Sequence, residues 1–147
     1  MRDMLSNKQV VLLGTVTLSG TTPGATSWVD TRGFDACTLV MATDTVTGAG
    51  TAAGFTFTAQ HSDATTAVSA ADIAAADSVN GAIAITVTDD VADDALAGGI
   101  GYKGSKRYVR LNVVGTSGTS ADVSVLAILN KPHRAKTTFA GTKVAAT

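Results

Sequence analysis

The clearest pattern of apolar and polar positions in this chain lies at residues 108–115, which read YVRLNVVG. Val109, Leu111 and Val113 fall on one side, and the residues between them fall on the other. Successive side chains of a β-strand point to opposite faces of the sheet, so this alternation is typical of a half-buried strand.

Other segments have the length and apolar content of strands. They are residues 10–18, 26–30, 36–42, 54–60, 81–88 and 123–130. The run ACTLVMA at 36–42 is almost continuously apolar, which predicts a strand covered on both sides. Residues 44–54 and 89–101 are rich in Gly and Asp or Thr and are expected to be loops.

One short helix is expected at residues 70–77, which are mostly Ala. Ser69 is suited to cap its N-terminus, and Asp72 at the third helical position suits the positive end of the helix dipole. The pair Asn80-Gly81 then ends it. Residues 1–8 are expected to form a flexible N-terminal arm, and residues 132–147 a C-terminal tail without regular period.

Short strands at roughly ten-residue spacing, with turns between them, indicate an antiparallel sandwich or barrel. We therefore predict an all-β fold, an antiparallel β-sandwich of the jelly-roll-like kind, as a single domain over residues 1–147. All twelve acidic residues are Asp and none is Glu. Asp favours caps and turns over helix interiors, so this composition argues against a helical protein.

The charges are segregated along the chain. Residues 1–98 hold three basic and eleven acidic residues, a net charge of −8, and residues 99–147 hold eight basic and one acidic, a net charge of +7. Two interpretations stay open. The halves neutralise each other within one fold, or opposite patches on neighbouring subunits attract one another in a lattice.

Cysteine content and hydropathy indicate the cellular compartment in which the chain is made and folds. Cys37 is the single cysteine, so no intrachain disulfide is expected. No apolar run approaches the length of about 18 residues that spans a membrane, and the first residues, MRDMLSNK, are too polar for a secretory signal. We expect synthesis in a reducing cytoplasm and no membrane partner.

The residues that suit enzymatic or metal chemistry are poorly arranged for it. In an extended chain His61 and Asp63 face one side and Ser62 the other, so the three cannot form a catalytic relay. Residues 99–106, GIGYKGSK, come close to a phosphate-binding loop, but Lys and Ser are reversed and a strand follows instead of a helix. The acidic residues at 89, 90, 93 and 94 lack the spacing of a calcium loop. We expect no enzyme activity, cofactor or metal.

A dense group of basic residues is the main candidate for binding. It consists of Lys103, Lys106, Arg107 and Arg110, four of the eleven basic residues of the chain. Tyr102 and Tyr108 beside them would suit nucleic acid. The acidic first part of the chain would repel it, so we favour a protein neighbour as the partner.

Three segments together resemble a known family. They are GFDACTLVM at 33–41, GFTFTAQHSD at 54–63 and GYKGSKRYVRLNV at 101–113, and the opening residues 2–5, RDML, fit the same pattern. They resemble minor capsid or head decoration proteins of tailed bacteriophages and prophages, over most of residues 1–134. The resemblance implies a non-enzymatic virion protein, made in the host bacterial cytoplasm, that binds the outside of an icosahedral head.

On that basis we expect a capsid cement protein that contacts the major capsid protein and other copies of itself. Lys103, Lys106, Arg107 and Arg110 are the expected contact residues. A head–tail connector or tail component is the structural alternative. A glycan-binding module is a third possibility, with Trp28 as the aromatic platform, although the position of Trp28 between a turn and a strand favours a core role.

Overall fold

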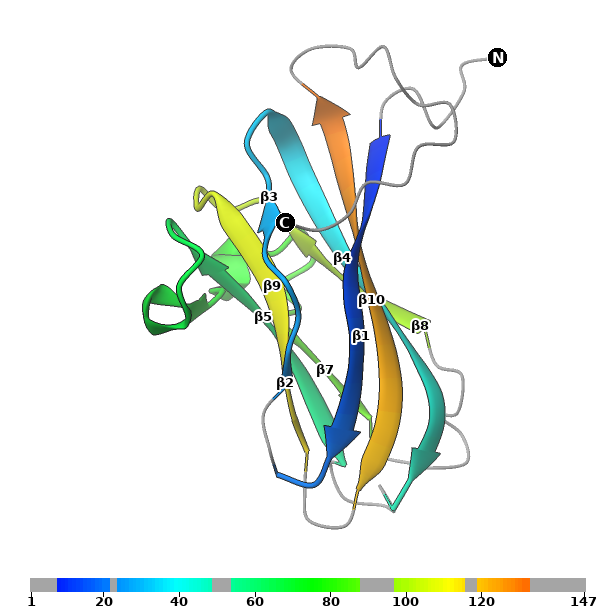
Figure 1. Ribbon diagram of the computed structural model, residues 1–147. Coiled ribbons are helices and arrows are strands. Elements are labelled where there is room, and N and C mark those ends of the chain that lie inside the picture. The colour runs from blue at the N-terminus through cyan, green and yellow to red at the C-terminus, as the bar shows by residue number, and fades with distance from the viewer. Residues whose placement is uncertain (1–7, 22–23, 49–53, 88–96, 116–118, 133–147) are drawn as a thin grey trace, which may run out of the picture.

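The computed structural model describes residues 8–21, 24–48, 54–87, 97–115 and 119–132. Its strands form two antiparallel sheets that face each other across one apolar core (Figure 1). The predicted all-β sandwich is therefore confirmed at the level of two packed antiparallel layers.

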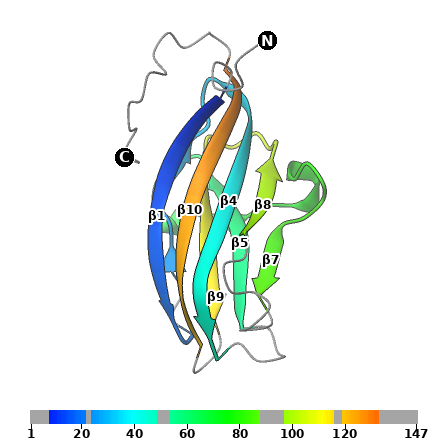
Figure 2. The same cartoon turned by 90° about the vertical axis from the view of Figure 1, so that its right-hand side faces the viewer.

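The first sheet has four strands in the order β1-β10-β4-β8. Their bounds are Lys8–Ser19 for β1, Ser120–Pro132 for β10, Phe34–Thr47 for β4 and Ala97–Tyr102 for β8. The two ends of the described chain, β1 and β10, lie side by side in this sheet (Figure 2), with Lys8 paired to Asn130 and Ser19 to Ser120. We call this sheet the four-stranded sheet.

The second sheet is built on two central strands, β5 at Phe55–Ser62 and β9 at Tyr108–Gly115. Two short strands, β2 at Gly24–Ala25 and β3 at Val29–Asp30, pair with β9. On the other side, β6 at Ala71–Asp72 and β7 at Ala84–Val87 pair with β5. We call this sheet the second sheet.

The core lies between the sheets and comes from alternate positions of the long strands. Phe55, Phe57, Leu111 and Val113 project into it from the second sheet and are fully buried, and Leu39 meets them from the four-stranded sheet. The alternation at 108–115 was thus correctly interpreted. Burying each side chain of this size contributes about 1.5–3 kcal/mol, and the buried side chains of the two sheets form one cluster.

A β-bulge in β1 changes which face its side chains reach. Before the bulge Val11 and Leu13 are buried, and after it Leu18 is buried instead. The register shift falls between Leu12 and Gly14, and Gly14 has a φ of 133°, a conformation that favours glycine. The bulge explains why residues 10–13, VVLL, show no simple alternation in the sequence.

The expected helix at residues 70–77 is wrong. The segment instead forms a 3₁₀ turn at Ala67–Ser69, the strand β6, and a second 3₁₀ turn at Ala75–Asp77. Ile73 is its only core residue, so a helix here would have no apolar stripe to bury, and nucleating a short helix is costly without one. Hydrogen bonding to β5 replaces it, because Ile73 N–H donates to the Ala59 carbonyl.

Several expected boundaries also need correction. The loop predicted at 89–101 contains strand β8 from Ala97, because Ile100 and Tyr102 are buried and anchor it. In the described part of the strand predicted at 81–88, β7 is formed at Ala84–Val87, and residues 81–83 precede it outside the strand. Strand β4 extends to Thr47, into the loop predicted from residue 44. The outer face of residues 36–42 is half-buried, not covered like the inner face.

The N-terminal arm and C-terminal tail predicted at 1–8 and 132–147 lie outside the described residues, except that Lys8 begins β1 and Pro132 ends β10. The described residues include no helix long and apolar enough to cross a membrane.

Candidate protein-contact surface

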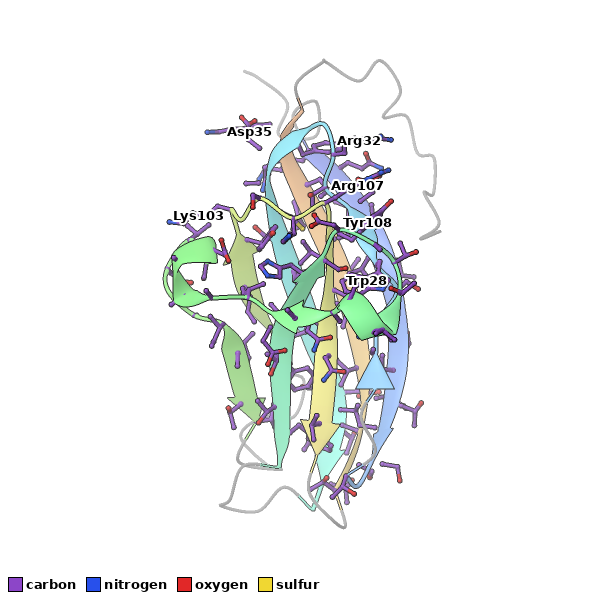
Figure 3. The ribbon with its side chains drawn as sticks, turned by 90° about the vertical axis from the view of Figure 1, so that its left-hand side faces the viewer. Trp28, Arg32, Asp35, Lys103, Arg107 and Tyr108 are labelled. Atoms are coloured by element: carbon purple, nitrogen blue, oxygen red, sulfur yellow. The ribbon has the colours of Figure 1, made fainter. Side chains whose placement is uncertain are left out.

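The predicted basic residues follow strand β8 and run into strand β9. Lys103, Lys106 and Arg107 lie in the connection between the two strands, and Arg110 lies within β9. Arg107, Tyr108 and Trp28 lie along one side of the second sheet, whereas Lys103 lies apart from them (Figure 3). The structure therefore splits the predicted group into Lys103 and a set that shares the second sheet.

Arg110 is the most firmly held member of this set. Its guanidinium carbon lies 4.4 Å from the centre of the Trp28 ring, and its Nε and Nη2 donate to Gln60 Oε1 at 3.0 and 2.9 Å. The Gln60 amide in turn donates to Asp72 Oδ1 at 2.9 Å. Desolvation lowers the pKa of Arg110, although the group stays cationic at neutral pH.

These four side chains form a row across the outer face of the second sheet, which we call the Arg110 row: Trp28, Arg110, Gln60 and Asp72. Strand register creates it, because Gln60 pairs with Arg110 on one side and with Asp72 on the other. Cross-strand neighbours of this kind fix each other's rotamers. Arg110 therefore presents its charge at a defined position, at little further cost in side-chain entropy.

Arg107 is paired with an acidic residue from the first part of the chain. Its Nε and Nη2 donate to both carboxylate oxygens of Asp30, at distances from 2.7 to 3.2 Å. Its guanidinium also lies 4.8 Å from the centre of the Tyr108 ring. Hydrogen bonding from Arg107 lowers the pKa of Asp30 and raises that of Arg107, so both stay charged over the physiological range.

Lys106 forms an ion pair with Asp63, just beyond the end of β5. Its backbone is held as well, because Lys106 N–H donates to the Tyr102 hydroxyl at 2.9 Å. That hydroxyl lies 3.2 Å from His61 Nδ1, and burial raises the pKa of Tyr102 to about 12. The connection between β8 and β9 is thus fixed at Lys106 by side-chain and backbone contacts.

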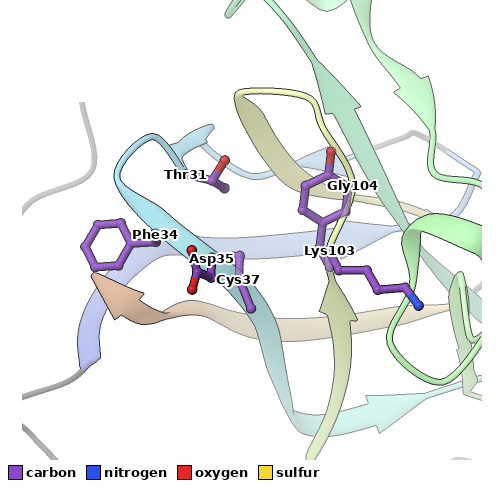
Figure 4. Close-up of a pocket in the computed structure, with 8 residues that line it drawn as sticks. Thr31, Phe34, Asp35, Cys37, Lys103 and Gly104 are labelled. Atoms are coloured by element: carbon purple, nitrogen blue, oxygen red, sulfur yellow. The ribbon is translucent and has the colours of Figure 1, made fainter. Parts of the chain in front are cut away.

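Lys103 is different, because its ammonium group has no partner among the described residues. Its backbone N–H donates to the Asp77 carbonyl, so its position is fixed although its charge is not paired. It borders a small pocket whose lining includes Asp35, Cys37 and Tyr102, and its side chain extends away from Asp35 and Cys37 (Figure 4). A cavity of about 20 Å³ accommodates one water molecule and no larger ligand.

The two halves of the sequence meet as charge pairs within the fold. Asp30 and Asp63 come from the acidic part, and their partners Arg107 and Lys106 come from the basic part. Exposed pairs of this kind contribute about 0–1 kcal/mol each. The interpretation that the halves neutralise each other is confirmed for these pairs, while the charge of Lys103 is paired with none of the residues that the structure describes.

The expectation for His61, Ser62 and Asp63 agrees with the contacts. Ser62 Oγ donates to Ser69 Oγ at 2.8 Å, while His61 Nδ1 lies beside the Tyr102 hydroxyl. The hydroxyl and the imidazole therefore engage different partners and form no relay. The acidic group at 89–94 lies outside the described residues, and the described part of the chain holds no cluster of three potential metal ligands.

Trp28 is a buried residue, in agreement with the expected core role. It is only 8% exposed, yet it lies outside the core cluster, on the outer side of the second sheet beneath Arg110. A sugar would have to displace the guanidinium to stack on this ring. The role of Gln60 as the link between Arg110 and Asp72 was missed; its signal in the sequence was the outward position of Gln60 and of Arg110 on their predicted strands.

Comparison with known proteins gives one informative likeness. No family model matches the chain, and no curated protein matches it. Among solved structures the fold is similar to that of the PBSX exported protein XepA, with a TM-score of 0.57 and 14% sequence identity. The match covers 98% of this chain and 44% of XepA. The chain thus spans less than half the length of XepA, and at this identity the likeness establishes the fold alone.

Proposed function

We propose that this chain is a structural virion protein, a minor capsid or decoration protein that binds the outside of a phage head and stabilises contacts between major capsid subunits. The observation that carries the proposal is the rigid charged surface of the second sheet. Arg110 is held there by Gln60 and Arg107 by Asp30, both on β-strands, and Lys106 extends this surface beyond the end of β5. Lys103 adds a separate charge in the connection between β8 and β9. Preorganised charge suits recognition of a fixed protein surface.

The strand order supports a jelly-roll-like fold, which is the finer form of the proposal. Successive strands alternate between the sheets: β1, β4, β8 and β10 belong to the four-stranded sheet, and the strands between them belong to the second sheet. Double-sheet jelly rolls are common in viral capsid domains and in lectins. The fold by itself does not assign a function, so the role depends on the sequence resemblance and the charged surface.

The likeness to XepA is compatible with this role. XepA is described as an exported protein of PBSX, and its fold is similar to that of this chain. The proposed partners are the major capsid protein and further copies of this chain. Many weak contacts on a repeating shell multiply the effective affinity, so no single contact needs to be strong.

Binding of purified protein to heads that lack it tests the proposal. Lys103→Glu reverses a charge that pairs with no group in the described part of the chain, so it should weaken binding at least tenfold without lowering stability. The triple variant Lys106→Ala, Arg107→Ala and Arg110→Ala should bind more weakly still. Lys131→Ala, which removes an exposed charge from the end of β10, is the matched control and should bind normally. Normal binding by both test variants would refute the proposed contact surface.

A further inference from the structure

The outward face of the four-stranded sheet is more apolar than a solvated sheet surface requires. Val10 and Leu12 on β1 are 48% and 52% exposed. Their cross-strand neighbours on β10 and β4 place each of them in a row of side chains. Val10 is next to Ile128 and then Thr38, and Leu12 is next to Leu126 and then Val40. Figure 2 shows these strands side by side, with this face toward the viewer.

The two rows continue across β4 to the edge of the sheet. On β8 they end at Gly101 and Gly99, which have no side chains to raise the surface. Val79 packs over Gly101, where an added Cβ would come within 2.9 Å of its Cγ2, and Val79 itself is 62% exposed. We call this surface the apolar face: Val10, Leu12, Val40, Val79, Leu126 and Ile128. Contiguous exposed apolar surface of this kind marks interaction sites.

Charges of opposite sign lie at the two ends of the apolar face. Lys8 pairs with Asn130 at one end, and Asp122 pairs with Thr17 at the other. Leu126 lies midway along β10 between Asn130 and Asp122, which are about 26 Å apart at 3.3 Å per residue. The face therefore has a basic end, the two apolar rows beside it, a polar row of Thr15 and Ser124, and an acidic end.

We infer that the apolar face binds the same face of a second copy of this chain. A two-fold axis between the copies, perpendicular to the strands at the Leu12–Leu126 row, would place Leu126 against Leu126. It would also bring Lys8 of each copy over Thr17 of the other, with Asp122 beside it. The charges at the two ends are thus self-complementary and the Leu12–Leu126 row meets itself, as a two-fold interface requires, while Val10 and Ile128 lie over Thr15 and Ser124 of the other copy. Packed sheets align in this way at about 10 Å separation.

The size of the face indicates a reversible dimer. Four strands about 4.8 Å apart and about 26 Å long give a planar area of about 500 Å². This is below the area of about 800 Å² per partner in standard interfaces and is typical of weak, transient contacts. We therefore expect a monomer–dimer equilibrium that shifts with concentration over the micromolar range.

Sedimentation equilibrium of the full-length chain tests the inference without any viral particle, so its outcome is separate from that of the proposed function. The wild type should approach twice the single-chain mass as concentration rises. Leu12→Ser should weaken the dimer at least tenfold. Val68→Ser, which changes a 98% exposed valine on the projecting 3₁₀ turn, is the matched control and should leave the dimer unchanged.

A charge exchange makes the test specific. Lys8→Glu alone and Asp122→Lys alone should each weaken the dimer, and the double variant should restore it. Lys8 and Asp122 lie at opposite ends of the face, so rescue cannot come from an internal pair. A monomer at all concentrations would overturn the inference. Trimers or larger species, a dimer insensitive to Leu12→Ser, or no rescue in the double variant would also overturn it.

Discussion

Replacing Arg110 by Ala gives the sharpest test of the charged surface, because the effect is visible at a single chromophore. Trp28 is the only tryptophan of the chain, and the Arg110 guanidinium covers its ring at 4.4 Å. The variant removes this cover together with two hydrogen bonds to Gln60. Trp28 should therefore become accessible to water while the core stays intact.

The magnitude follows from these contacts. A cation–π contact at a partly desolvated site contributes about 1 kcal/mol. Hydrogen bonds from a charged donor to Gln60 add about 1 kcal/mol after solvent screening. We expect Arg110→Ala to lower the free energy of unfolding by about 1–2 kcal/mol, which for a chain of this size lowers Tm by about 3–6 °C. Arg110→Lys should lose most of the hydrogen-bond contribution and retain part of the cation–π contribution.

Tryptophan fluorescence is the assay. Arg110→Ala should shift the emission of Trp28 to longer wavelength and increase its quenching by acrylamide, with Arg110→Lys intermediate. Val68→Ser, far from the ring in sequence and wholly exposed, serves as the control and should leave the emission unchanged. If the emission and quenching of Arg110→Ala match the wild type while the protein stays folded, the Arg110 row is not formed as described.

Two further predictions concern the core. Burial raises the pKa of the Cys37 thiol to about 12, from an ordinary value of 9.0, so the native thiol should resist thiol reagents until the chain unfolds. The folded state keeps this proton up to about pH 12, whereas the unfolded state loses it above pH 9.0. The contribution of Cys37 to the free energy of unfolding is therefore fully present below pH 9.0 and falls by about 1.4 kcal/mol per pH unit up to about pH 12. Urea unfolding at pH 7 and pH 10 should show a smaller loss of stability in Cys37→Ala than in the wild type. At Gly115 an added Cβ would come within 2.5 Å of the Gly20 carbonyl oxygen and 2.8 Å of Phe55 Cε1, so Gly115→Ala should cost about 1–3 kcal/mol. Gly99→Ala, whose Cβ would meet nothing closer than 3.4 Å, is the control, and equal Tm values for the two variants would contradict the packing at Gly115.

The sequence was most informative where a strand has one buried face. The alternation of residues 108–115 and 54–60 predicted β9 and β5 closely, because one sheet face is core and the other is not. The sequence was misleading where the helix propensity of a segment and its packing in the fold favour different structures. The Ala-rich segment near Ile73 has helix propensity, yet it can bury only that one side chain, and pairing with β5 prevails.

Strand β8 was missed for a related reason. Its sequence AGGIGY looks like a loop because three of six residues are glycine. Gly98 faces Ile85, where a Cβ would come within 3.0 Å of Cδ1, so part of this composition reflects close packing between the sheets. Contacts of that kind depend on residues far apart in the chain and leave no local signal.

The candidate surface was predicted as a cluster of charges but not as a set of contacts. The sequence placed Arg110 on the outward side of its strand, since its neighbours Val109 and Leu111 face the core. It did not show that Asp30 and Asp63 approach Arg107 and Lys106, because these pairs join residues more than forty positions apart. Sheet register decides them, and register is set by the whole core.

The copy number of this chain in purified phage particles tests the central claim most directly. Quantitative mass spectrometry against the most abundant virion protein should find the chain at hundreds of copies per particle, as expected for a protein that decorates a repeating shell. Six or twelve copies would indicate a connector ring instead. Absence of the chain from intact particles would contradict the proposed role altogether.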